Sequence, residues 1–275
     1  MESFLQNRTL PLLLLLMFGA VLLIVQTKWP LVKHRQSLKG RLFTNGIMAS
    51  LTYVAAIFLV RPSVFYAMEL SSNANWGILK LLPNNIIIQA SAAFLLMDLS
   101  FYYWHRLNHK VNILWRFHNV HHIDRDMDVS TGFRFHFAEV ALSSIFRFLQ
   151  VLVIGPSLLI FLSYEFIFQM CTFFHHSNLR LPLALDNLLK WLVVTPRMHE
   201  IHHSNFKNET DSNYSVVFSF WDRIHKTFTK NVPMERVVIG VPGYSEPGDN
   251  SLKNLIISPF RKQKDYWRGQ IQRPD

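Results

Sequence analysis

Four long apolar segments dominate the sequence and restrict it to folds that belong in a membrane. They cover residues 9–26, 43–60, 86–104 and 137–174. Each of the first three approaches the roughly 20 apolar residues that a helix needs to cross the hydrocarbon core of a bilayer. The fourth is longer and is interrupted by Gly155-Pro156, which predicts a hairpin of two short spans. We therefore predict an all-α, integral membrane helical bundle of about four to five spans.

The first apolar segment has two possible interpretations, a retained span and a cleaved signal peptide. No small-x-small cleavage pattern follows it. The next basic residues are Lys28, Lys33, Arg35, Lys39 and Arg41. This order of an apolar run and a basic stretch is a stop-transfer pattern, which favours a retained span.

The same basic stretch predicts the orientation in the membrane. Residues 28–41 contain five Lys or Arg and no acid, so the positive-inside rule places them in the cytoplasm. When the spans are counted from this stretch, residues 61–85 lie outside. They contain Pro62 and Pro83 and are predicted to form a loop with a short interfacial helix at most. Residues 105–136 and the last hundred residues become cytoplasmic. We favour a bacterial inner membrane over the endoplasmic reticulum.

Cysteine and charge content limit the classes of site and partner. One cysteine, Cys171, among 275 residues excludes a disulfide framework and all-thiolate metal sites. The formal net charge of +10 does not indicate nucleic-acid binding, because the basic residues flank apolar runs instead of forming one patch with interleaved aromatic residues. We expect no nucleic-acid partner.

Histidines form the most specific local pattern. Of the 13 histidines, only His34 lies outside residues 105–225. Three boxes have helical spacing, in which residues three or four apart share a face. They contain His105 and His109; His118, His121 and His122; and His199, His202 and His203. Because imidazole is a common ligand of Zn, Cu, Fe and Ni, these boxes predict metal ligation.

The remaining histidines carry weaker signals. From residue 178 onwards the sequence is predicted to form a compact cap of short helices and loops. His175 and His176 end the fourth apolar region, where the turn into this cap brings them towards the boxes, and we include both as predicted ligands. A helix-capping role or a hydrogen bond to a ligand is the alternative. His136 has three possible roles, as a ligand, as a hydrogen-bond partner of a ligand or as an interface residue. His34 and His225 are interpreted as ordinary hydrogen-bonded residues.

Two acidic residues are predicted to act in the site. Asp98 lies two helical turns before His105 within an apolar run, where an acid needs a partner. Metal-bound imidazoles usually donate their second N–H group to a carboxylate or a carbonyl. Glu200, inside the last box, has the same possible role, with an exposed position on a cap helix as the alternative.

The number of histidines favours two metal ions over one. Catalytic zinc takes three protein ligands and structural zinc takes four, fewer than the eight histidines of the three boxes. One alternative is a zinc hydrolase, because residues 199–203 match H-E-x-x-H with Glu200 as the general base. That interpretation leaves the other boxes unexplained. A metal transporter would instead distribute histidines and acids through several spans.

Taken together, these motifs resemble the fatty acid hydroxylase/sterol desaturase superfamily, most closely its compact bacterial sterol desaturase members. The segments that carry the resemblance are DLSFYYWHRLNH (98–109), WRFHNVHH (115–122), RFHFAE (134–139), FFHHSN (173–178), TPRMHEIHHS (195–204) and DSNYSVVFSFWDRIHKTF (211–228). The pieces VNILWRFHNVHH and STGFRFH also resemble the alkylglycerol monooxygenase branch of this superfamily.

The resemblance implies a cytoplasmic helical cap that holds a dinuclear iron site. It implies two Fe ions that use O2 to hydroxylate or desaturate a C–H bond of a lipid from the bilayer. The two electrons are expected from an external donor, namely a ferredoxin, a cytochrome b5 type protein or a pterin. Three regions are predicted: N-terminal transmembrane segments and loop (1–84), the catalytic domain (85–230) and a cytoplasmic C-terminal tail (231–275).

Overall fold

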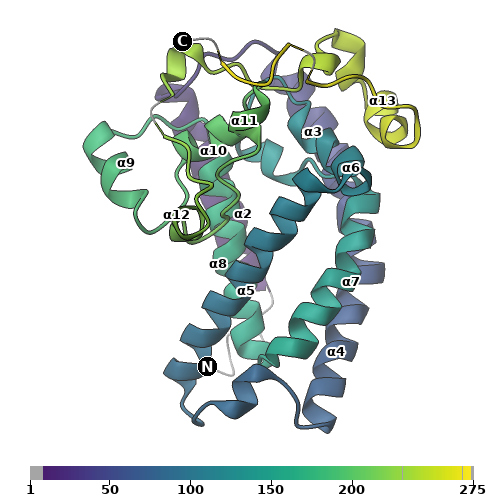
Figure 1. The fold of residues 1–275 in the computed structure, drawn as a ribbon, viewed down its shortest axis with the longest axis vertical. Helices are drawn as coiled ribbons and strands as arrows, with labels where there is room; N and C mark the ends of the chain where they lie inside the picture. Colours follow the sequence, from purple (N-terminus) through teal and green to yellow (C-terminus); the bar gives the residue numbers. More distant parts are fainter. Residues whose placement is uncertain (1–8, 231, 268, 274–275) are drawn as a thin grey trace.

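Five long apolar helices form the body of the protein in the computed structural model, which describes residues 9–230, 232–267 and 269–273 (Figure 1). Four of them are α2 (Thr9–Lys28), α5 (Ile86–Lys110), α7 (Phe137–Ile154) and α8 (Leu158–His176). The fifth is continuous through α3 (Leu38–Ala55), the π-helix η1 (Ala56–Val60) and α4 (Arg61–Asn73). All five are long and apolar enough to cross a membrane. The predicted all-α membrane bundle is confirmed.

The helix from Leu38 to Asn73 overturns part of the predicted loop at residues 61–85. Pro62 occupies the first turn of α4, directly after the π-helical segment η1. A proline removes one backbone donor and normally ends or kinks a helix, but a preceding π-bulge absorbs the change in hydrogen bonding. The helix therefore continues, and only residues 74–85, with the short 3-10 helix η2 (Ile78–Leu81), form the connection to α5.

The predicted hairpin at residues 137–174 is present as α7 and α8. Gly155 ends α7 with φ of 71°, in the left-handed region, and its N–H donates to the carbonyl of Val151. This loop touches the one after α4, because a Cβ atom on Gly155 would lie 2.9 Å from the carbonyl oxygen of Trp76. Glycine is thus required both by the backbone conformation and by the close approach.

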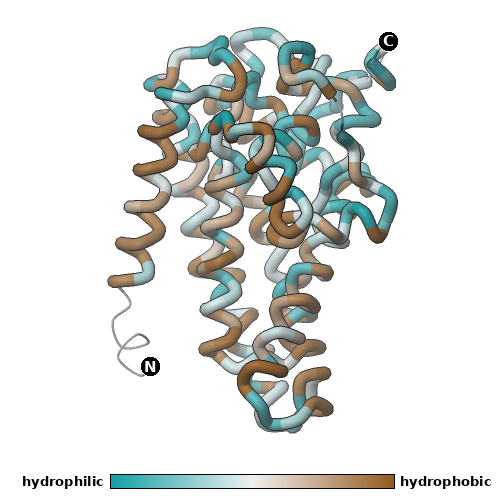
Figure 2. The backbone as a smooth tube through the Cα atoms, turned by 90° about the vertical axis from the view of Figure 1, so that its left-hand side faces the viewer, coloured by the Kyte–Doolittle hydropathy of each residue, from teal (hydrophilic) through white to brown (hydrophobic). Residues whose placement is uncertain are grey.

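Short helices and loops form a cap at one end of the bundle. Before α7 it contains α6 (Asn112–His122) and η3 (Val129–Phe133). After α8 it contains α9 (Leu183–Leu189), α10 (Pro196–His202), α11 (Lys207–Thr210), α12 (Phe220–Ile224), η4 (Met234–Arg236), η5 (Pro242–Tyr244), η6 (Pro247–Asn250), α13 (Leu252–Ile257) and η7 (Ser258–Phe260). Figure 2 shows the hydropathy contrast, with hydrophobic spans below and most hydrophilic backbone in the cap. The described residues contain isolated bridges but no named strand, as expected for an all-α protein.

A buried ionic network fixes the cap to the start of α3. The Arg41 guanidinium donates to both oxygens of Asp124, at 3.1 and 2.9 Å, and also to Asp128. Arg134 lies 3.7 Å from Asp124 and donates to the carbonyl oxygen of Val120. Burial acts to raise the pKa of Asp124, but the charges of Arg41 and Arg134 hold it well below its ordinary value. The network thereby anchors the chain just after α6, which carries three of the boxed histidines.

Candidate metal centre

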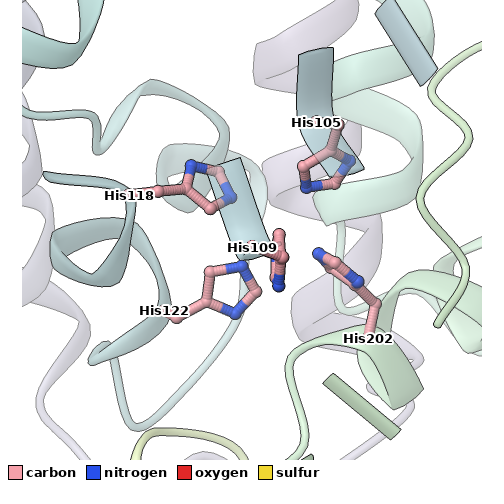
Figure 3. Close-up of side chains that lie close together, drawn as sticks. All are labelled: His105, His109, His118, His122 and His202. Atoms are coloured by element: carbon pink, nitrogen blue, oxygen red, sulfur yellow. The ribbon is translucent and has the colours of Figure 1, made fainter. Parts of the chain in front are cut away.

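Nine of the 13 histidines converge in two groups in the cap end of the bundle. We call the first the five-histidine cluster; it contains His105, His109, His118, His122 and His202. Figure 3 shows these five rings turned towards one another. The second, the four-histidine cluster, contains His121, His176, His199 and His203. Within each cluster, one ligand atom per residue lies within 4.8 Å of all the others.

Helical geometry explains how short boxes serve two clusters. On α5, His105 and His109 are four residues apart and face the same side. On α6, His118 and His122 are likewise four apart and join the five-histidine cluster, whereas His121 points into the other one. At the end of α10, His199 and His203 point into the four-histidine cluster.

His202 completes the first cluster and His176, from the end of α8, completes the second. Each adjacent pair, His121-His122 and His202-His203, is therefore divided between the clusters. Consecutive side chains on a helix point in different directions, so one H-x-x-H-H box can contribute to two ion sites.

The nitrogen positions of the four-histidine cluster suit one metal ion. The Nε2 atom of His176 lies 3.1 Å from that of His121 and 2.9 Å from that of His199. The Nε2 atoms of His199 and His203 are 3.2 Å apart. Two nitrogens bound to one ion at about 2.0–2.1 Å are separated by roughly 2.9–3.4 Å. The spacing of these nitrogens matches a shared ion.

Several of the inward-facing nitrogens have no other partner. Nε2 of His118, Nε2 of His202 and both ring nitrogens of His122 are buried and make no hydrogen bond among the described residues. Leaving buried polar atoms unpaired is costly. An ion held at the centre of the five-histidine cluster would satisfy Nε2 of His118, Nε2 of His202 and one of the two ring nitrogens of His122.

The opposite ring nitrogens are held by oxygen atoms. Nδ1 of His105 bonds to the carbonyl oxygen of Tyr214 at 2.7 Å, and Nδ1 of His202 bonds to that of Ser212 at 2.6 Å. Nδ1 of His118 lies 2.8 Å from Oε1 of Glu139. Such bonds make Nδ1 the donor and leave Nε2 free to bind a metal. This is the arrangement expected around metal-ligating histidines.

Burial keeps the imidazoles of His122, His202 and His203 neutral. It lowers the pKa of His202 to about 3, although the bond to Ser212 acts in the opposite direction. Burial and neighbouring imidazoles place the pKa values of His122 and His203 well below the ordinary value. Metal ions bind the neutral form of histidine. The clusters are therefore ready for metal at neutral pH without first losing protons.

The two clusters are in contact with each other. The rings of His122 and His203, one from each cluster, are stacked with centroids 4.3 Å apart and planes 16° apart. The rings of the neighbours His121 and His122 are 5.3 Å apart. Two ions bound by these clusters would be close neighbours, which is the geometry of a dinuclear site.

Three predicted site residues lie outside both clusters. His175 packs beside His199, with ring centroids 4.2 Å apart, but does not join either group. Asp98 does not bind His105; it accepts hydrogen bonds from the Phe218 amide and the Trp221 indole, each at 2.9 Å.

Glu200 is the third predicted site residue that lies outside both clusters. It is buried, its carboxylate makes no hydrogen bond among the described residues, and burial raises its pKa to about 8. It belongs to neither group of potential ligands. Glu200 is therefore not placed as a metal ligand. A zinc hydrolase would use it as a base and not as a ligand, but that interpretation still leaves the other histidine boxes unexplained.

The other histidines have structural partners. Nδ1 of His136 accepts from the backbone N–H of Ala138 and caps α7. His225 bonds to the Tyr103 hydroxyl at 2.8 Å, and Nε2 of His34 lies 3.1 Å from the amide nitrogen of Asn178. The sequence left three roles open for His136; in the structure its side chain caps the N-terminus of α7.

Sequence reasoning missed the contribution of Glu139. This acid lies near the start of the fourth apolar segment. An acid in such a position requires a buried partner, and His118, 21 residues earlier, provides it. The separation along the chain hides this pair from local spacing rules.

Comparisons with known proteins agree with this site. Residues 90–227, half of the chain, match the fatty acid hydroxylase family. Human alkylglycerol monooxygenase is 33% identical over 200 residues, which cover 70% of this chain and 43% of the relative. The ornithine lipid hydroxylase of Rhizobium tropici is 29% identical over 156 residues, covering 56% of this chain and 46% of the relative.

Human cholesterol 25-hydroxylase is 29% identical over 143 residues, covering 50% of this chain and 51% of the relative. The chain thus spans about half the length, or less, of these curated relatives. No solved structure matches it significantly. The matched region contains all nine clustered histidines, and the chain belongs to the fatty acid hydroxylase family.

Proposed function

We propose that this protein is a membrane-bound di-iron oxygenase that hydroxylates or desaturates a C–H bond of a lipid. The observation that carries the proposal is the pair of adjacent, buried, all-histidine clusters at the ends of membrane-spanning helices. Relatives named as lipid hydroxylases and a monooxygenase support a reaction with oxygen.

Iron is the metal we assign to both clusters. Imidazole ligands suit Fe as well as Zn, Cu and Ni, but hydroxylation requires a metal that exchanges electrons, which zinc does not. When bound, the iron pair supplies the reduction of O2 that breaks the C–H bond. In hydroxylation, one oxygen atom enters the lipid and the other leaves as water, with two electrons and two protons consumed. In desaturation, two hydrogens leave the lipid and both oxygen atoms leave as water.

The residues of this chain hold and orient the site. Five and four histidines, respectively, would bind the two ions. The carbonyl oxygens of Tyr214 and Ser212 fix the rings of His105 and His202, and Glu139 fixes that of His118. The clustered rings are nearly inaccessible, as His202 and His203 both have 0% exposed surface. Exclusion of water protects a reactive site from side reactions.

The partners follow from the chemistry. The lipid would enter from the bilayer, because the spans and the clusters meet at the boundary of the cap. The two electrons would come from an external donor, which we take to be a ferredoxin, a cytochrome b5 type protein or a pterin. We place the clusters and the C-terminus on the cytoplasmic side, in a bacterial inner membrane, because of the basic stretch after α2.

Metal analysis combined with lipid analysis tests the proposal. The protein would be expressed with supplementary iron, purified, and analysed for metals. Total lipids of cells that express the wild type would be compared with those of cells that express His121→Ala, under 18O2. We expect about two Fe per chain, and a lipid that gains one labelled oxygen or loses two hydrogens only with the wild type.

Two results would overturn it. Zinc as the bound metal, with activity in the absence of O2, would favour a hydrolase. An unchanged lipid profile despite full iron loading and a supplied electron donor would contradict lipid oxidation. His225→Phe is the matched control, because His225 lies outside the clusters and its ring stacks on Tyr102 with centroids 4.5 Å apart, so phenylalanine preserves the packing.

A further inference from the structure

A second site candidate is a basic cavity beside α10, apart from the histidine clusters. It has a volume of about 970 Å³, and its described lining contains none of the clustered histidines. Segments 31–35 and 180–183 form much of its wall, and Arg197 of α10 contributes from another side. Arg180 connects the two segments, because its side chain donates to the carbonyl oxygen of Leu31 at 3.2 Å.

The cavity carries a surplus of positive charge. Its cationic lining residues are Lys33, Arg35, Arg180 and Arg197. Two acids offset them: Glu235 in the described lining, and Asp186, 3.7 Å from Arg197. These six residues together carry a formal charge of +2. The Nε atom of Arg197 is the one that faces Asp186, and it makes no hydrogen bond among the described residues. These features indicate an anionic ligand.

The position along the chain places the cavity at the edge of the hydrocarbon core. The span in α2 ends at Lys28 and that in α8 ends at His176, so both wall segments begin within a few residues of a span. Headgroup phosphates of a bilayer lie at this depth. Leu31, Leu181 and Met234 add apolar wall to the basic groups. Such a mixed lining suits an amphiphile better than a fully soluble anion.

The neighbouring helix α9 has the polarity of a membrane-surface helix. Leu183 and Leu188 are 64% and 69% exposed, whereas Asp186 is 2% exposed. Trp191, just after α9, is 66% exposed. A helix that faces water exposes polar residues and buries apolar ones. In α9 the apolar residues are exposed and the acid is buried, which suits contact with lipid. In Figure 1, α9 projects from the side of the cap, to the left of α10 and α12. Leu183 also lines the cavity, so the cavity opens next to a lipid-contacting surface.

We propose that this cavity binds the phosphate headgroup of an anionic bilayer lipid, with the basic residues around the phosphate and α9 in the adjoining monolayer. Basic pockets at the cytoplasmic boundary of membrane proteins are suited to anionic headgroups. The proposal concerns a binding site, and it does not depend on the reaction at the histidine clusters.

Thermal melting of the purified full-length protein in detergent tests the assignment. Three additives would be compared at equal ionic strength: dioctanoyl phosphatidylglycerol, dioctanoyl phosphatidylcholine and inorganic phosphate. We expect only phosphatidylglycerol to raise the melting temperature in a saturable manner, because a ligand that binds the folded state stabilises it. In Lys33→Gln/Arg180→Gln its apparent affinity should fall by about 25-fold, the product of about fivefold per basic residue.

The control removes the same charge elsewhere in the cap. Lys253→Gln/Lys262→Gln lies outside the cavity lining and should bind phosphatidylglycerol like the wild type. An equal shift with phosphatidylcholine, or an equal loss in this control, would overturn the site. A shift with inorganic phosphate alone would identify a soluble-anion site and overturn the lipid assignment. If the first double variant does not fold, Lys33→Gln, at an exposed position, carries the test with an expected loss of about fivefold.

Discussion

Glu139 and His118 are joined by a hydrogen bond of 2.8 Å between Oε1 and Nδ1. Glu139 lies in the first turn of α7 and His118 in α6, so the bond connects a membrane span to the cap. It holds the ring with Nε2 directed towards the five-histidine cluster. The carboxylate also raises the basicity of Nε2, which would strengthen its bond to a metal ion.

Replacement of Glu139 should weaken metal binding without removing a ligand. We expect Glu139→Ala to lower the metal affinity of the five-histidine cluster by about 10- to 100-fold, because His118 loses its orienting partner. Glu139→Gln retains an acceptor oxygen and should lose less. Competition with a chelator would measure the affinity, and Glu69→Gln, at an exposed position in α4, is the control. Equal affinity in wild type and Glu139→Ala would show that the bond has no role in ligation.

The adjacent residues His121 and His122 should report on different metal ions. His121→Ala removes a member of the four-histidine cluster and His122→Ala a member of the five-histidine cluster. Each variant should contain less metal than the wild type, because the cluster that has lost a ligand binds its ion more weakly. Because His122 has four companions and His121 only three, we expect the larger loss in His121→Ala. Metal-per-chain analysis together with a spectroscopic probe of iron coupling would check this. Identical spectra in the two variants would contradict two separate ion sites.

Much of this site was predictable because helical periodicity is a local rule. The spacing of His105 and His109, and of the two H-x-x-H-H boxes, placed these side chains on common faces before any tertiary contact was considered. The clustering of residues 105–122 with residues 175–203 followed from the count of spans. Both depend on sequence-local signals, namely apolar length and residue spacing, and the structure places the eight boxed histidines in the two clusters.

The remaining features depend on contacts between distant segments. Asp98 shares a helix with His105, yet its carboxylate is used by the loop at residues 217–221. His175 and His176 are adjacent, and only the latter faces the cluster, because the end of α8 fixes which ring points inward. The continuation of the helix past Pro62 required a π-helical segment, for which no sequence signal was used. Pairing over such distances cannot be obtained from periodicity.

His136 should contribute to stability and not to metal content. As the N-cap of α7 it accepts the Ala138 amide at 3.1 Å, and replacing a capping residue by alanine costs about 1 kcal/mol. We therefore expect His136→Ala to melt at a lower temperature while it retains its metal. His136→Asn should recover part of the loss, because asparagine is a strong N-cap. Loss of metal in His136→Ala would instead assign it to the centre.

The metal-free protein should become less stable as the pH falls below about 6.5, the ordinary pKa of histidine. Burial lowers the pKa of His202 to about 3 and places those of His121, His199 and His203 well below 6.5. Between these values the unfolded chain binds protons that the folded protein does not, so acid favours unfolding. At pH 5.5 the cost is about 1.4 kcal/mol per histidine.

Glu200 has the opposite effect on the stability of the metal-free protein at low pH. Because burial raises its pKa to about 8, the folded protein holds a proton that the unfolded chain releases above about pH 4.3, which favours folding as the pH falls. One such group does not offset four or more histidines. Melting of metal-stripped protein from pH 8 to pH 5.5 would measure the balance, and a melting temperature that rises towards acid would contradict it. Metal-loaded protein should change less, because the ion occupies the nitrogens.

Arg41 should be among the most sensitive positions outside the metal centre. It is 4% exposed, and it neutralises Asp124 and Asp128, which are both buried. Arg41→Met leaves these carboxylates without their main partner, and breaking a buried ion pair in this way costs roughly 3–5 kcal/mol. The control is Lys39→Met on the same helix, at an exposed position, with an expected effect within about 0.5 kcal/mol. The double variant Arg41→Met/Asp124→Asn should recover part of the loss, because it removes one uncompensated charge. Unfolding in a denaturing detergent would measure all three, and equal stability of Arg41→Met and Lys39→Met would show that the network does not anchor the cap.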